Sequence, residues 1–88
     1  MLQGFRISTR KNKKYDAIVN HNGITKYIPF GDSRYLQYYD NTGLGIYSHL
    51  NHLDKERQRL FMLRQKEDNF YNVLSPAYYS INYLWSVQ

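Results

Sequence analysis

Residues 23–40 read GITKYIPFGDSRYLQYYD, and this stretch decides the fold. It begins as a strand, which Pro29 and Gly31 bring to an end, and it continues as a tyrosine-rich connector. Proline has no N–H group to give to a sheet, so a strand that contains it either ends there or lies at a sheet edge. The residues before this stretch have the pattern of β-strands and the residues after it have the pattern of helices. The chain is therefore predicted to be α+β.

Three short runs of alternating apolar and polar residues predict three strands. These runs are residues 5–9, 15–20 and 24–30. In the second run, Tyr15, Ala17 and Val19 share one face of the predicted strand. We expect these strands to form a three-stranded antiparallel meander within residues 1–31.

Two turn signals frame the third strand. Asn22-Gly23 lies between two apolar runs, and both residues accept the positive φ of a type I′ hairpin turn. Phe30-Gly31 begins the exit turn, in which Gly31 is expected to have a positive φ. A connector then follows, with short helical turns expected within residues 32–52, at 34–39 and 46–52.

The main helix is predicted over residues 53–68. Asp54 is suited to the N-cap, and the segment that follows consists of good helix formers without glycine or proline. The apolar residues that can form a core stripe are Leu53, Leu60, Leu63 and Phe61. A short C-terminal helix is predicted over 75–86, because Ser75 can cap it and Pro76 suits the first helical position.

The aromatic content is high for a chain of 88 residues. Ten tyrosines, four phenylalanines and one tryptophan exceed what the thin core of one small domain can hide, and there is no cysteine to form a disulfide. Tyrosine suits a surface that is buried against a neighbour. We therefore expect a chain assembled in a larger complex. The aromatic residues predicted to form its protein interface are Tyr71, Tyr79, Tyr83 and Trp85.

Charge is unevenly distributed along the chain, whose net charge is +5. Residues 1–14 carry no acidic side chain, and residues 69–88 carry no charged side chain. The predicted basic patch consists of Arg10, Lys11, Lys13, Lys14, Arg57, Arg59 and Arg64. Such a patch can meet phosphate groups or an acidic protein, and interspersed tyrosines can stack on unpaired bases. A solvated basic turn is the alternative interpretation.

No motif in the sequence indicates catalysis. There is no nucleophile elbow and no cysteine, and His49 and His52 have no third ligand for a metal at a defined spacing. We expect no enzyme activity, no cofactor and no metal site. No apolar run is long enough for a membrane span and no signal peptide is recognisable, so the expectation is a soluble intracellular protein.

Several short motifs, in order, carry a resemblance to a known family. They are Lys13-Lys14-Tyr15, Gly23, Ile28-Pro29-Phe30-Gly31, Tyr39-Asp40, Asp54-Lys55-Glu56-Arg57, Ser75-Pro76-Ala77-Tyr78-Tyr79-Ser80 and Tyr83-Leu84-Trp85. Together they resemble a group of small, poorly characterised proteins of large (nucleocytoplasmic) double-stranded DNA viruses and some phages. The family typically has Arg-His where this chain has Arg64-Gln65, so a role for that histidine does not carry over.

The resemblance implies a setting: a large icosahedral shell built from a major capsid protein and small minor proteins. We therefore expect a structural virion component, a minor capsid protein that binds capsid neighbours through exposed aromatic residues. Its location would be the virion, and the host cytoplasm or nucleus during assembly. The alternative is a basic nucleic-acid-binding protein associated with the packaged genome.

Overall fold

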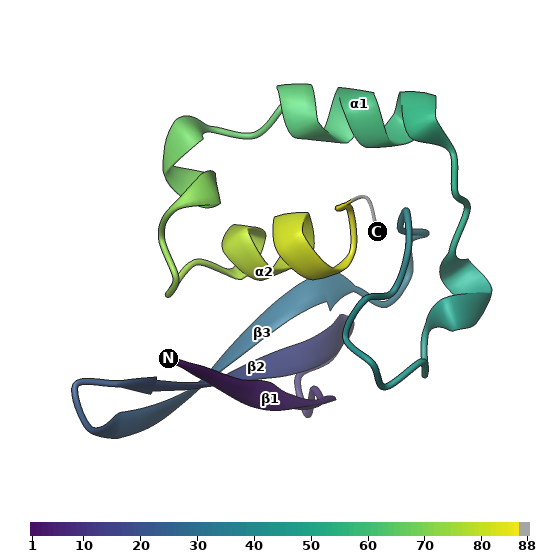
Figure 1. The fold of residues 1–88 in the computed structure, drawn as a ribbon. Helices are drawn as coiled ribbons and strands as arrows, with labels where there is room; N and C mark the ends of the chain where they lie inside the picture. Colours follow the sequence, from purple (N-terminus) through teal and green to yellow (C-terminus); the bar gives the residue numbers. More distant parts are fainter. Residues whose placement is uncertain (87–88) are drawn as a thin grey trace.

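A three-stranded antiparallel sheet followed by two helices forms the α+β fold of this chain (Figure 1). The computed structural model describes residues 1–86. In Figure 1 the helix α2 lies over the sheet, and α1 lies on the far side of α2. Within the described residues, no helix combines the length and apolar character that crossing a membrane requires.

The strands pair in chain order, with β2 at the centre. They are β1 (Leu2–Ile7), β2 (Lys13–His21) and β3 (Ile24–Asp32). Asn22 and Gly23 have φ angles of 54° and 78°, which confirms the predicted hairpin turn between β2 and β3. Gly31 also has a positive φ, as predicted, but it lies within β3, which continues to Asp32.

The core lies between the sheet and α2 (Pro76–Tyr83). Its members are Tyr15, Ala17, Val19, Ile28, Phe30, Tyr79 and Leu84. The predicted face of β2 is therefore the buried one. Ser75 accepts a hydrogen bond from the N–H of Ala77 and Pro76 occupies the first turn, so the predicted helix start is confirmed. The helix ends at Tyr83, before the predicted boundary at residue 86.

The connector after β3 is not helical at residues 34–39, where a helical turn was expected; a turn at Ser33 and Arg34 leads into an isolated bridge at Gln37. Gln37 pairs with Asn51 in an isolated parallel bridge, and its side-chain amide donates to the carbonyl of Tyr47 and to Asn51 Oδ1, both at 2.7 Å. This buried amide fixes the backbone in a bridge, so contacts distant in sequence override the local tyrosine spacing. The second predicted turn is confirmed as η1 (Ser48–Leu50).

The helix α1 (Lys55–Leu63) is shorter than predicted, and the short 3₁₀ helix η2 (Glu67–Phe70) follows it. Asp54 caps α1 by accepting from the N–H groups of Glu56 and Arg57, as expected. With nine residues in α1 and eight in α2, the two helices are of similar length. The description of one main helix and one short helix is therefore only approximate.

The predicted core stripe of α1 is wrong for three of its four residues. Leu53, Leu60 and Leu63 are exposed, and the buried residue of α1 is Gln58, whose amide donates to the carbonyl of Trp85 at 2.7 Å. The physical reason is the position of α1 beyond α2, where the sheet core does not reach it. Only Phe61 of the predicted stripe packs inward.

Candidate functional site

Of the four aromatic residues predicted to face a partner, Tyr71 is strongly exposed, at 73%. Tyr79 is 1% exposed, and the prediction that it faces a partner is wrong. Its ring packs against Phe30 with centroids 5.8 Å apart, and its hydroxyl donates to the carbonyl oxygen of Val73 at 2.6 Å. Tyr79 is a core residue because α2 directs it onto β3.

Tyr83 and Trp85 are half-buried and make their contacts within the chain. The ring of Tyr83 meets Phe5 edge-on at 4.7 Å between centroids. The indole of Trp85 stacks on Phe61 at 4.2 Å with an angle of 6° between the planes. These contacts use much of the ring surface that the prediction assigned to a partner, so neither residue stands free as an anchor.

Further exposed apolar side chains come from two neighbouring parts of the sequence, the second half of α1 and the segment from Phe70 to Val73. We call these residues the α1–η2 surface: Leu60, Leu63, Phe70, Tyr71 and Val73. Leu63 is 69% exposed although it is a leucine in a helix. A helix normally turns its apolar residues toward the core, so this surface is unusual. The α1–η2 surface was not predicted from the sequence, because leucines at helical spacing are more often core residues.

The predicted basic patch is divided between two places. Arg10, Lys11 and Lys13 are exposed at the turn between β1 and β2, whereas the three arginines of the patch lie on or next to α1. In Figure 1 these elements lie on opposite sides of α2. Lys14 is only 2% exposed, so its assignment to a surface patch is wrong. Its burial follows from its place on the central strand, under the connector.

A pocket of about 380 Å³ lies between α1, α2, the end of β3 and the start of the connector. Its walls are mainly apolar, and Lys14, Asp32, Gln65 and Ser80 contribute polar groups. The apolar and aromatic lining residues are Tyr35, Leu36, Phe61, Ala77, Leu84 and Trp85. Its size and lining are those of small-molecule sites, which are concave and mostly apolar with a few polar groups.

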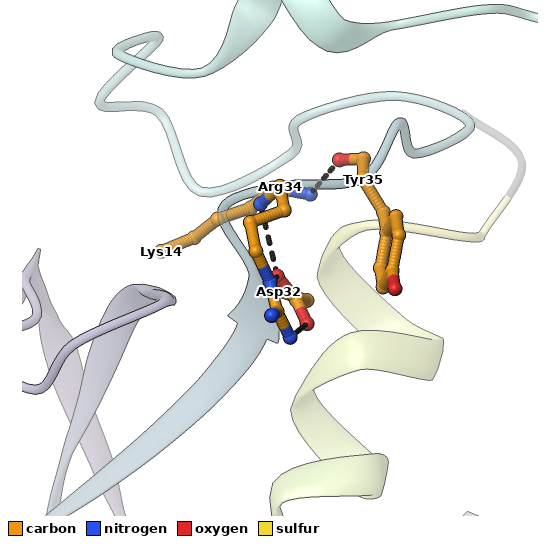
Figure 2. A network of polar contacts seen from close by, with 4 residues as sticks. All are labelled: Lys14, Asp32, Arg34 and Tyr35. Carbon is orange, nitrogen blue, oxygen red and sulfur yellow. Dashed lines mark hydrogen bonds and ion pairs between the residues drawn. The ribbon is translucent and has the colours of Figure 1, made fainter.

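Lys14 crosses the backbone of Gly31 to reach this pocket. Its Nζ donates to the carbonyl oxygen of Tyr35 at 2.9 Å (Figure 2). A Cβ at Gly31 would lie 3.2 Å from Cδ of Lys14 and 2.8 Å from Cδ1 of Leu84. A glycine at this position therefore makes room for the lysine stem.

The carboxylates near Lys14 accept hydrogen bonds from other residues. Asp32 accepts from Arg34 through both carboxylate oxygens, at 3.0 and 2.7 Å (Figure 2). These hydrogen bonds hold the pKa of Asp32 well below its usual range. Burial lowers the pKa of Lys14 to about 8, and the charges of Asp32 and Asp40 oppose that shift. The amine is therefore still largely charged at pH 7.

The two histidines that were considered as metal ligands have different environments. His49 is exposed, whereas His52 is half-buried and packs against Trp85 with ring centroids 5.2 Å apart. The Nδ1 atom of His52 accepts a hydrogen bond from the N–H of Asp54 at 2.9 Å. In the part of the chain that the structure describes, no group of three or more histidine, aspartate or glutamate side chains is placed to hold a metal ion.

Comparisons with protein-family models, curated proteins and solved structures found no match to this chain.

Proposed function

We propose that the chain is a structural virion component, a minor capsid protein that binds a capsid neighbour through exposed apolar side chains. The observation that carries the proposal is the α1–η2 surface, where a helix exposes leucines and the following segment exposes Tyr71. The resemblance of its sequence motifs to small proteins of large DNA viruses supplies the setting. The binding is non-catalytic: the α1–η2 surface offers apolar contact area.

Covering the exposed apolar side chains of this surface would contribute free energy to a specific contact. Burying apolar area contributes about 25 cal/mol per Å², and full burial of one leucine or phenylalanine side chain contributes about 1.5–3 kcal/mol. Leu63 and Tyr71 are the most exposed members, so each gains most from a partner. Large aromatic and apolar residues at the centre of an interface carry most of its binding energy. We expect these two residues to be the anchors.

Charged residues flank the apolar members of the surface in the sequence. Residues 55–68 contain five basic and three acidic side chains, and Arg59 is paired with Glu56. A polar rim around an apolar centre is the usual anatomy of a protein interface. The small positive excess favours a neighbour whose facing surface is weakly acidic.

The alternative, a nucleic-acid-binding protein, is supported by the exposed turn with Arg10, Lys11 and Lys13. Two features of the fold weaken it. Lys14 is buried, and α1, which carries other basic residues of the patch, lies on the opposite side of α2 from this turn. Phosphate binding falls steeply with salt because counterions are released. Salt dependence therefore separates the two proposals.

The test is binding of this chain to the major capsid protein of the same genome, measured at 50 and 500 mM KCl. We expect the double variant Leu63→Ser/Tyr71→Ser to bind at least ten-fold more weakly, because both anchors are lost. Ile24→Ser is the matched control, because Ile24 is 61% exposed but lies on the β2–β3 hairpin. The wild-type affinity should change little between the two salt concentrations.

Two results would contradict the proposal. One is equal binding by the double variant and by the wild type. The other is binding to nucleic acid, but not to capsid protein, with an affinity that collapses at 500 mM KCl; this result would favour the basic turn.

A further inference from the structure

The pocket beneath α1 is not used by the proposed protein contact. It is lined by segments distant in sequence: β2 and the end of β3 with the connector, the end of α1, and α2. Contacts of Trp85 hold α1 in place above it, through the stacked ring of Phe61 and the amide of Gln58. Pockets whose walls are already in place bind small molecules without a large ordering cost, so these two contacts favour binding.

The ammonium group of Lys14 has more hydrogen-bond donors than acceptors around it. An ammonium group has three N–H donors, and within residues 1–86 the hydrogen bond found for it is the one to the carbonyl of Tyr35. The two nearby carboxylates have other donors. Asp32 is held by Arg34, and Asp40 accepts from Tyr15 and Thr42. A buried charge without full pairing is costly, so an anion that reached this amine would be favoured.

We propose that this pocket binds a small carboxylate with an apolar body, whose carboxylate pairs with the ammonium of Lys14. The apolar body lies against Phe61, Leu84 and Trp85, which line the same cavity. The volume of about 380 Å³ suits a molecule of about the size of 3-phenylpropanoate. A phosphate dianion fits less well. Lys14 supplies only one positive charge, and the nearby negative charge of Asp32 repels a second negative charge on the ligand.

The probes are 3-phenylpropanoate and its neutral amide, titrated into the full chain at pH 7 while backbone amide NMR signals are followed. We expect saturable shifts at Gly31, Ser80 and Leu84, which line the pocket. The carboxylate should bind at least ten-fold more tightly than the amide, because only the carboxylate pairs with the ammonium group.

Two variants separate the role of charge from non-specific attraction. Lys14→Met keeps the length of the stem and removes the amine, so the preference for the carboxylate should disappear. Lys13→Met is the matched control, because Lys13 is the neighbouring residue on β2 and is exposed. It removes the same net charge and should leave binding unchanged. Ala77→Leu fills the pocket and should weaken both probes.

A wild-type measurement keeps the test decisive if Lys14→Met does not fold. The pKa of Lys14, followed through its side-chain carbon signals, should rise above about 8 when the carboxylate binds, because the bound anion favours the charged amine. The proposal is overturned by the absence of saturable shifts, by equal affinity for acid and amide, or by an unchanged pKa of Lys14. None of these results would affect the proposed capsid contact, which uses other residues.

Discussion

Gly31 and Lys14 show how single residues set the geometry of the pocket. The sequence predicted the positive φ of Gly31, because a glycine between a strand and a turn commonly has that conformation. It did not predict that the stem of Lys14 lies against this glycine. A lysine in a basic run is usually solvated, and only the connector that covers β2 makes Lys14 a buried residue.

Replacing Gly31 by alanine should destabilise the fold more than replacing Gly23. Both glycines have φ near 75°, so both alanines suffer a similar backbone strain. Only at Gly31 does the added Cβ collide, at 2.8 Å from Leu84 Cδ1. We expect Gly31→Ala to lose about 1–3 kcal/mol more than Gly23→Ala in the free energy of unfolding, measured with urea. Equal losses of unfolding free energy in the two variants would contradict close packing at Gly31.

Tyr15→Phe should cost about 1–3 kcal/mol of unfolding free energy, because its hydroxyl is a buried hydrogen-bonding group. It donates to Asp40 and accepts from the N–H of Tyr47. Burial and the hydrogen bond to Asp40 raise the pKa of Tyr15 to about 12. Tyr71→Phe is the control, with a change of about 0.5 kcal/mol or less, since Tyr71 is exposed. Equal effects in urea unfolding would contradict the buried network.

At the scale of elements, the sheet was the part best predicted from sequence. The alternation of apolar and polar residues and the Asn22-Gly23 turn are local signals, and they predicted β2 and β3 correctly. The starts of the helices were also predicted from local signals, the capping residues Asp54 and Ser75. What failed was the assignment of faces on α1. Helical spacing does not say where the helix lies, and α1 packs through Phe61 and Gln58 rather than through its leucines.

The attachment of α1 should weaken in acid through His52. Burial, followed by the charge of Arg57, lowers the pKa of His52, while Asp54 opposes the shift. The folded state therefore prefers the neutral ring, whose Nδ1 accepts from the N–H of Asp54. This stability is present above the unfolded pKa of about 6.5 and is lost as the pH falls toward the folded pKa.

The measurement is the urea midpoint at pH 7.5 and pH 5.5 for the wild type and for two variants. His52→Gln should reduce the loss of stability at pH 5.5. His49→Gln should keep the wild-type loss, because His49 is exposed and lies outside this contact. An unchanged pH dependence in His52→Gln would contradict the account of α1.

For the whole molecule, composition predicted an aromatic interface near the C-terminus, and this prediction was partly wrong about which residues are exposed. The tyrosines exceed what a small core needs, and this suggested an aromatic interface at the C-terminus. In the structure Tyr79 is in the core and Trp85 packs against α1, so of the four predicted residues Tyr71 alone is strongly exposed. The α1–η2 surface depends on how α1 sits beyond α2. That arrangement comes from contacts between distant residues, which a local pattern does not contain.

The most direct test of the proposed capsid role is fractionation of the virions in which this chain would occur into shell and genome-containing core, with mass spectrometry of this protein in each fraction. We expect recovery with the shell, at a fixed ratio to the major capsid protein. The Leu63→Ser/Tyr71→Ser variant should be depleted from the shell, and the Ile24→Ser variant should not. Recovery with the genome, or absence from purified virions, would contradict the central claim.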